Sequence, residues 1–272
     1  PEPRNRVDRW LFSRLRKTLA QVEKDYETYD YRPVAQHLYD FLWSDYCDWY
    51  LEALKIRLYG NPAQKEDALQ QGLYALSYLL QALHPLIPFL TEALWQQFPF
   101  TSKGLLQETP WKVPPWDFPK EEGWFENIRS ACKAIRGMKR DLDIPITQKS
   151  TVYIHPLPAE EDKSLIEKLA WVEVKAGEHF SALALEEKIH PWHLVHPVPD
   201  KGQIVKKIQE INQALVKIQE KKNKLSQILR DEKFQFSAPA HIQENFRSQL
   251  RSAEEEEKEL KRKWERLSTT LK

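Results

Sequence analysis

Apolar residues recur every three or four positions through most of the first 140 residues, which is the spacing of one face of an amphipathic helix. Pro33 is well placed to begin a helix, and Gly60 followed by Pro62 is typical of a helix end. The pattern predicts helices over residues 7–22, 33–58, 63–83, 89–98 and 124–140, and a proline-rich loop over 99–119. Short connections between successive helices indicate a bundle, and we expect the loop to lie on it.

The pattern changes after Pro145. Residues 151–154 and 171–174 read as strands, whereas residues 160–169 have the spacing of a helix. We therefore expect a small α/β connector over residues 146–200.

The last seventy residues have the most regular pattern. Apolar residues separated alternately by four and three positions form two heptad stripes, Ile204 to Leu229 and Phe246 to Leu271, interrupted only by Lys222 and Glu257. Polar residues at such positions are typical of a register-setting interruption. Two heptad helices joined by about ten residues predict an antiparallel coiled-coil hairpin, with each arm roughly 40 Å long.

The predicted fold is therefore mainly α, in three parts. A helical bundle takes residues 1–145, the small α/β connector takes 146–200, and the coiled-coil arm takes 201–272.

Positive charge is concentrated in one segment of the arm. The formal net charge of the chain is only +1, but residues 201–230 hold 8 basic and 2 acidic residues, while residues 231–272 hold 9 of each. An uneven distribution of this kind points to a polyanionic partner such as nucleic acid.

The remaining composition argues against several other functions. Cys47 and Cys132 are isolated, so we expect no disulfide framework and no zinc site, and a reducing cytoplasmic setting is the default. His190, His193 and His196 are close in sequence, but their spacing fits no metal site with enough ligands. No apolar stretch of roughly 18 residues occurs, so we expect no membrane span.

Four segments of the chain resemble parts of one family of enzymes. Residues 40–52, DFLWSDYCDWYLE, are similar to the second helix of the anticodon-binding bundle of class I valine–tRNA ligases. Residues 5–15, NRVDRWLFSRL, and 84–95, HPLIPFLTEALW, resemble neighbouring segments of that bundle, and the terminal hairpin with Lys233-Phe234 and Ala238-Pro239 resembles the family's arm. The resemblance covers nearly the whole chain, in order, and is weakest over residues 150–200.

The resemblance implies binding of valine-specific tRNA by a monomer. The family activates valine with ATP, using a His-Ile-Gly-His-type signature and a Lys-Met-Ser-Lys-Ser-type loop, and the sequence contains neither. A chain that begins Pro1-Glu2-Pro3, with Met138 as its only methionine, is expected to be a fragment. We therefore expect no catalytic residue, no metal, no cofactor in this span and no aminoacylation by this chain alone, with ATP required by the full-length enzyme.

The family's anticodon site implies an exposed aromatic ring beside polar and basic groups, because unpaired bases stack on rings. Most rings of the helix over 33–58 must be buried, and Phe41 is our candidate for the exposed one. Candidate RNA contacts of the bundle are Glu23, Phe41, Lys55, Arg57, Lys103 and Leu105. Asp45 and Asp48 lack any accompanying nucleophile or cofactor motif, and we expect them to pair with Arg9 or Arg14.

The basic helix of the arm carries a second set of candidates. Charged residues on a coiled coil usually serve only to keep its surface hydrated. Such a surface normally carries positive and negative charges in similar numbers, whereas residues 201–230 are almost purely basic. Phosphate contacts to the outer corner of the tRNA are expected from Lys206, Lys207, Lys217, Lys221, Lys224 and Arg230.

Two alternatives stay open at this point. The hairpin could bind another protein, with the bundle an inert relic of a ligase. The RNA role could also belong to the equivalent region of an isoleucine-type ligase, which shares the bundle but not usually the hairpin.

Overall fold

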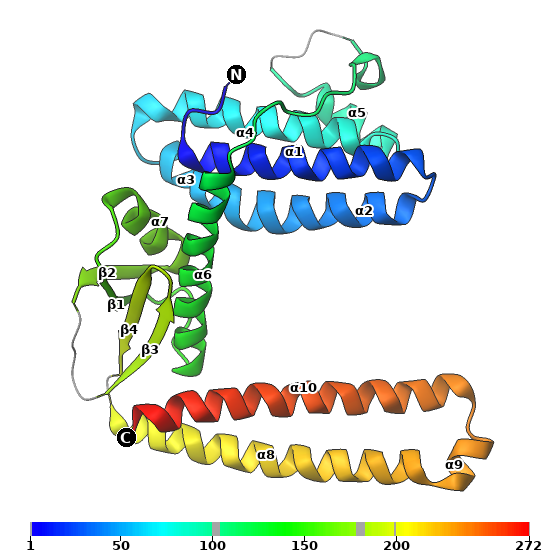
Figure 1. The fold of residues 1–272 in the computed structure, drawn as a ribbon, viewed down its shortest axis with the longest axis vertical. Helices are drawn as coiled ribbons and strands as arrows, with labels where there is room; N and C mark the ends of the chain where they lie inside the picture. The colour runs from blue at the N-terminus through cyan, green and yellow to red at the C-terminus, as the bar shows by residue number, and fades with distance from the viewer. Residues whose placement is uncertain (1, 100–103, 178–182, 199, 272) are drawn as a thin grey trace. The chain divides into compact units, whose positions relative to one another are not determined.

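The computed structural model describes residues 2–99, 104–177, 183–198 and 200–271. The mainly α fold predicted from the sequence is confirmed (Figure 1). The chain divides into two compact units, Pro1–Lys133 with Pro158–Val172, and Ala134–Leu157 with Glu173–Lys272. The three-part division at residues 145 and 200 stays a prediction.

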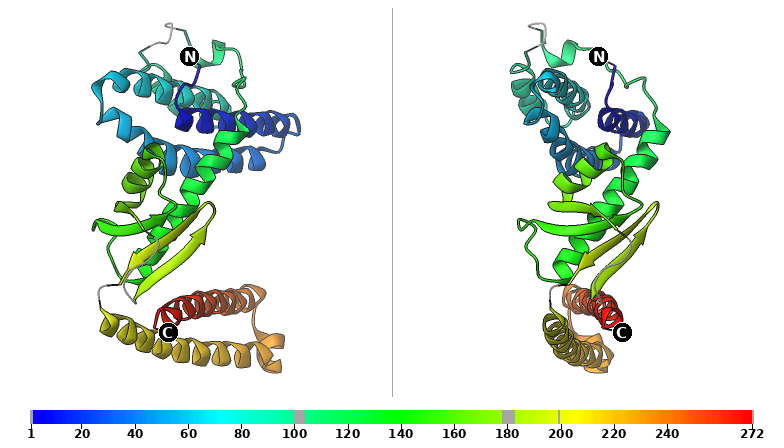
Figure 2. Two further views of the ribbon diagram at one scale, coloured as in Figure 1. Left: turned by 60° about the vertical axis from the view of Figure 1, so that its left-hand side comes forward. Right: turned by 90° about the vertical axis from the view of Figure 1, so that its left-hand side faces the viewer.

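The first unit is built on long helices that lie side by side (Figures 1 and 2). These are α1 (Arg6–Glu27), the continuous run of α2 (Tyr31–Asp40), η1 (Phe41–Leu51) and α3 (Glu52–Leu58), and α4 (Pro62–Leu83), followed by the short α5 (Pro88–Trp95). Asn5, Asp30 and Asn61 precede these helices, and each side chain accepts a hydrogen bond from a backbone N–H of the first turn. The helices predicted over this region are confirmed. They could be predicted because their caps and apolar stripes are local features of the sequence.

One part of the second helix departs from the α-helical period. Residues Phe41–Leu51 form a π-helix, in which hydrogen bonds span five residues rather than four. The buried positions of η1 accordingly come as neighbouring pairs, Asp45 with Tyr46 and Trp49 with Tyr50. The α-helical spacing of about 3.6 residues does not predict a π-helix, and so could not show which side chains of Phe41–Leu51 face the core.

Aromatic rings join the first unit's later segments to the bundle. Helix α6 (Pro119–Asp141) begins in this unit, and its Phe125 stacks on Trp10 with ring centroids 3.9 Å apart and lies edge-on to Trp49. Helix α7 (Glu160–Ala170) is held by a hydrogen bond from the Trp124 indole to Asp162, at 2.8 Å. These contacts make one core from segments far apart in sequence.

The predicted proline-rich loop lies on the bundle, as expected. Its single turn of 3₁₀ helix, η2 (Leu106–Glu108), buries Leu106 against Leu80 and Trp95. Further along the loop, the ring of Trp116 lies edge-on to Phe12.

The second unit contains a four-stranded sheet in the order β2-β1-β4-β3. The strands are β1 (Ser150–His155), β2 (Val172–Ala176), β3 (Ala184–Ile189) and β4 (Trp192–Pro197). β4 is antiparallel to both neighbours, with Tyr153 opposite Val195 and Leu185 opposite His196. The first two strands and α7 were predicted, whereas the β3–β4 hairpin was not.

The remaining helices of this unit form a hairpin, as predicted. Helices α8 (Lys201–Arg230) and α10 (Ala240–Thr270) run antiparallel and side by side, joined through the short α9 (Glu232–Ser237) (Figures 1 and 2). We call this hairpin the arm. Seam residues are buried along it, including Ile204, Ile211, Ile218, Ala253 and Leu267. At 1.5 Å per residue, each helix is about 45 Å long.

Candidate nucleic-acid interface

Phe41 is not the exposed ring of the bundle, so that expectation is wrong. Phe41 is 3% exposed, because Val34, Leu38 and Phe41 form one apolar stripe that α2 and the start of η1 bury. Tyr39 and Trp43 lie off this stripe and are 61% and 58% exposed. The rings of these two residues are parallel, with an interplanar angle of 2° and centroids 6.4 Å apart. The spacing of the buried stripe in the sequence could have identified them.

A cleft lined mostly by polar residues lies among α1, α2, η1 and α6. It has a volume of 440 Å³ and is lined by Arg14, Lys17, Thr18, Gln21, His37, Asp40, Phe41, Ser44, Asp45 and Arg129. Asp40 and Ser44, which line the cleft, are the sequence neighbours of Tyr39 and Trp43, and the two rings themselves are not among its lining residues. Phe41 therefore contributes an apolar part of the cleft wall rather than an exposed platform.

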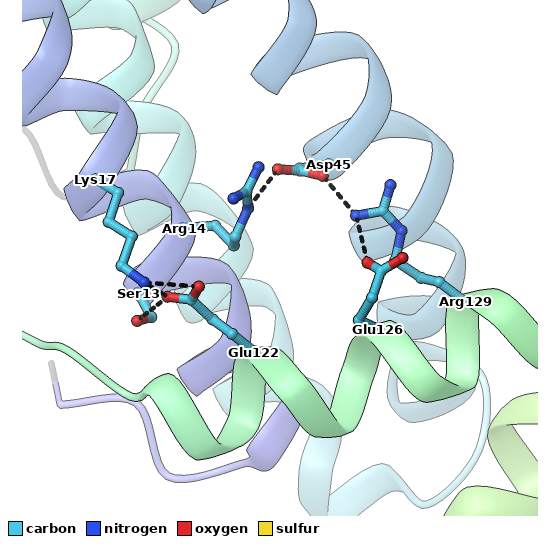
Figure 3. Close-up of polar contacts among 7 residues, drawn as sticks. All are labelled: Ser13, Arg14, Lys17, Asp45, Glu122, Glu126 and Arg129. Atoms are coloured by element: carbon cyan, nitrogen blue, oxygen red, sulfur yellow. Dashed lines mark hydrogen bonds and ion pairs between the residues drawn. The ribbon is translucent and has the colours of Figure 1, made fainter. Parts of the chain in front are cut away.

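Ion pairs and hydrogen bonds tie several of the cleft's charged side chains to one another and to neighbouring residues. Figure 3 shows Asp45 between two guanidinium groups, with Arg14 Nε and Arg129 Nη1 each 3.0 Å from a carboxylate oxygen. Glu122 accepts hydrogen bonds from Ser13 and Lys17 (Figure 3). The predicted pairing of Asp45 with Arg14 is confirmed, whereas Asp48 is exposed.

The Arg14 side chain retains hydrogen-bonding capacity. It bonds Asp45 through Nε, is 42% exposed, and within the described part of the chain its two terminal nitrogens donate to nothing. A partly exposed guanidinium with free donors in such a cleft can bind the polar edge of a base or a phosphate.

Arg57, expected to contact RNA, is instead part of the core. It is 8% exposed and pairs with the fully buried Asp8, which also accepts a hydrogen bond from the Tyr50 hydroxyl at 2.9 Å. Burial raises the pKa of Asp8, and the neighbouring Arg57 acts in the opposite direction. The correction follows from a contact across 49 residues that no local pattern reveals.

The other bundle candidates come from separate segments. Glu23 is exposed on α1, Lys55 is exposed on α3 and pairs with Glu52 at 2.5 Å, and Leu105 is 44% exposed before η2. Lys103 lies outside the described residues. The structure does not bring these side chains together by any contact among the described residues.

On the arm, five of the six basic candidates are exposed. They are Lys206, Lys217, Lys221, Lys224 and Arg230, all on α8. Lys207 differs, because its side chain is 14% exposed and pairs with Asp143. Burial, followed by the nearby charge of Lys263, lowers the pKa of Lys207. Its charge is therefore committed within the protein.

The two polar interruptions of the seam meet across the hairpin. Lys222 Nζ lies 2.5 Å from Glu257 Oε2, and Lys261 bonds the other oxygen of Glu257 at 2.6 Å. The hydrogen bonds from Lys222 and Lys261 lower the pKa of Glu257 to about 2. This pair opposes one position of α8 to one position of α10, which fits a register-setting role.

Sequence reasoning missed a second basic region, on α10. The balanced charge of residues 231–272 hides an acidic block at 254–257 followed by five basic residues within 258–266. These are Lys258, Lys261, Arg262, Lys263 and Arg266. Counting charge in shorter windows would have separated the two blocks.

The three histidines near residue 190 do not converge. His196 is 3% exposed and bonds the Pro197 carbonyl and the Ser150 hydroxyl, whereas His193 pairs with Glu186 on β3. Within the described residues, no group of three or more metal-ligating side chains could hold an ion. None of the described helices combines the length and apolarity needed to cross a bilayer.

An exposed aromatic pair and a cleft lined by charged side chains, together with a helix whose charges are mostly positive, have the surface chemistry of an RNA-binding protein. The family model described as the anticodon-binding domain of tRNA ligase matches residues 8–154. The chain belongs to this family.

Similar proteins extend the match over most of the chain. It is 28% identical over 262 residues to a valine–tRNA ligase of Thermotoga maritima, covering 92% of this chain and 29% of that protein. It is 26% identical over 247 residues to the valine–tRNA ligase of Bacillus subtilis, covering 87% of this chain and 28% of that protein. The chain thus spans less than a third of the length of the curated relatives it matches, and its resemblance to the C-terminal region of valine–tRNA ligases is confirmed.

Proposed function

We propose that this chain is the tRNA-recognition portion of a valine–tRNA ligase. The bundle docks the anticodon stem-loop, and the arm binds the outer corner of the same tRNA. The observation that carries the proposal is the exposed, parallel ring pair of Tyr39 and Trp43 on a bundle of the anticodon-binding family.

The ring pair suits the chemistry of an unpaired loop. Bases splayed out of a loop stack on aromatic rings, and their edges are read by nearby donors and acceptors. Tyr39 and Trp43 supply the rings, and the cleft lined by their sequence neighbours Asp40 and Ser44 supplies Arg14 and Asp40. Glu23, Lys55, Lys103 and Leu105 remain candidates for further contacts to the loop.

The arm suits the phosphate backbone. Its exposed lysines lie on one helix with few carboxylates, so a polyanion meets little repulsion there. Such contacts release counterions, give affinity and orientation, and carry no sequence information. Recognition of the tRNA's identity is therefore assigned to the bundle, and orientation to the arm.

The chemistry of valine transfer lies outside this chain. Activation with ATP belongs to a catalytic domain of the longer protein, and this chain alone carries out no aminoacylation. The protein acts in the cytoplasm as a monomer.

Filter binding tests the proposal. A valine tRNA transcript and a mismatched tRNA are compared at two salt concentrations, and we expect tighter binding of the valine tRNA and weaker binding at the higher salt. Absence of tRNA binding at low salt would leave the protein-interaction alternative. The anticodon bases of the tRNA are then swapped for those of an isoleucine tRNA in the same assay. Tighter binding of the tRNA with the isoleucine anticodon would assign the chain to an isoleucine-type ligase.

Replacing the ring pair tests the bundle's part. Loss of stacking costs about 1–3 kcal/mol per base, so Tyr39→Ala with Trp43→Ala should weaken binding about 5- to 150-fold. Tyr59→Ala is the matched control, because Tyr59 is 83% exposed at the end of α3, away from the pair in sequence. If the double variant weakens tRNA binding no more than Tyr59→Ala does, the ring pair is not part of the site.

A further inference from the structure

The base of the arm, where α8 begins and α10 ends, is tied to the rest of its compact unit by charged contacts. On α10, Arg266 Nη1 lies 3.0 Å from Asp141 Oδ2, at the end of α6. Its Nη2 lies 3.3 Å from Glu187 Oε2, on β3. One guanidinium therefore joins the arm to both a helix and a strand.

The surroundings of Arg266 favour a fixed geometry. The Asp141 side chain is 7% exposed, so it has little water to replace a missing partner. The guanidinium also lies over Gly137, one turn before Asp141, where an added Cβ would be 3.6 Å from Nη1. The next residue on α10, Leu267, is fully buried. A planar group with two carboxylate partners has less freedom than a single ammonium contact.

A second tie involves the other helix of the arm. Lys207, on α8, pairs with Asp143, just beyond the end of α6. Lys263 Nζ donates to the Arg140 carbonyl at 3.4 Å. Both helices of the arm are thus attached to residues 140–143. One attachment would act as a pivot, whereas attachments on two helices resist swinging in more than one direction.

We propose that Arg266 is a positioning residue that fixes the direction in which the arm leaves the sheet. It acts through Asp141 and Glu187 and does not touch RNA. For tRNA binding, which rests on the function proposed above, a fixed arm is already placed when the tRNA arrives and gives up less freedom on binding. The affinity for tRNA then depends on the fraction of molecules whose arm points the right way.

Two other roles for Arg266 make different predictions. A purely structural residue would affect folding without changing the arm's direction. A residue that binds a phosphate would contribute to the salt dependence of tRNA binding, so its removal would lower the slope by about 0.9. The test must separate direction, folding and phosphate binding.

Spin-label distances measure the direction directly and need no RNA. Labels are placed at Lys149→Cys, beside β1, and at Ser248→Cys, on α10, in the full chain with Cys47→Ser and Cys132→Ala. We expect a narrow distance distribution in this background. Arg266→Ala should broaden it while the helical signal of the chain is kept. Arg262→Ala is the matched control, since it removes the same charge four residues away and forms no ion pair among the described residues.

A second variant keeps the test decisive if Arg266→Ala fails to fold. Glu187→Gln removes only the β3 partner, whose side chain is 29% exposed, and should broaden the distribution partially. A distribution that stays narrow in Arg266→Ala, or in Glu187→Gln when Arg266→Ala is unfolded, would overturn the proposal.

Binding measurements then separate positioning from phosphate binding. If the fraction of correctly directed arms falls to about a tenth, the Kd of Arg266→Ala for valine tRNA rises about tenfold. The slope of log K against log salt should stay that of the parent, and a lower slope would show that Arg266 binds a phosphate and contradict the proposal. If the parent chain binds no tRNA, the function proposed above fails, while the distance measurement still tests whether Arg266 fixes the direction of the arm.

Discussion

Replacing Arg57 by Met tests whether the stability of the first unit depends on the buried ion pair of Arg57, a residue whose place in the sequence suggested an exposed position. The Arg57 side chain is 10% exposed and the Asp8 side chain is fully buried, so Arg57→Met leaves an uncompensated carboxylate in the core. Breaking one side of a buried pair costs about 3–5 kcal/mol. The second partner of Arg57, Asp67, is 44% exposed at 3.4 Å and adds little to this free energy.

Urea denaturation followed by tryptophan fluorescence measures this decrease in stability, since Trp10 and Trp49 are buried in the same unit. Lys55→Met is the matched control: Lys55 is two positions earlier on the same helix and exposed, and among the described residues it pairs only with the exposed Glu52. It should change the free energy of unfolding by no more than about 0.5 kcal/mol. A decrease below about 1 kcal/mol for Arg57→Met would refute the assignment of Arg57 to the core.

The pH dependence of the same variant provides a second check. Burial raises the pKa of Asp8 from its ordinary value of 3.8, and Arg57 lowers it, so removing Arg57 raises this pKa further. A folded-state pKa above the unfolded one means that the folded state binds a proton more readily, so stability is gained as the pH falls. The free-energy gap between the parent and Arg57→Met should therefore narrow toward acid pH. A gap independent of pH would mean that Asp8 is not the carboxylate left behind.

Two further predictions concern the arm. Reversing the three exposed lysines at positions 217, 221 and 224 to Glu should weaken tRNA binding and lower the salt slope by up to about 2.7, at about 0.9 per phosphate bound, with helicity unchanged; an unchanged slope would remove α8 from the interface. The pKa of Glu257 is lowered from 4.5 to about 2, so its stabilising contribution is complete above pH 4.5 and is lost as the pH falls toward 2. Unfolding followed by circular dichroism should show this acid-dependent loss of stability in the parent and not in Glu257→Gln. Equal acid sensitivity of parent and variant would contradict the role of the Lys222 pair.

Features that depend on neighbours in the sequence were predictable. The ends of α4 follow from Asn61, Pro62 and the apolar spacing up to Leu83, and the arm follows from two heptad stripes that each keep their spacing throughout. The β3–β4 hairpin was missed because half of β3 is charged, at Glu186, Glu187 and Lys188, and because the two six-residue strands meet at His190-Pro191. The fold class was therefore accessible, but part of the connector was not.

The candidate site was predictable only in part. The stripe of Val34, Leu38 and Phe41 already implied that Phe41 is buried and that Tyr39 and Trp43 are not. The outward position of most α8 lysines likewise follows from the heptad period. For these residues the period was enough to predict exposure, whereas for Arg57 and Lys207 it was not.

The sequence by itself determined the helices, the antiparallel arm and the concentration of positive charge on α8. Only the tertiary structure decided which charges are available to a ligand, because a carboxylate brought close by folding can pair with a basic residue. Arg57 is taken up by Asp8, 49 residues away, and Lys207 and Arg266 by carboxylates near the end of α6. Such partners are brought together by packing, and the local period of the chain carries no record of them.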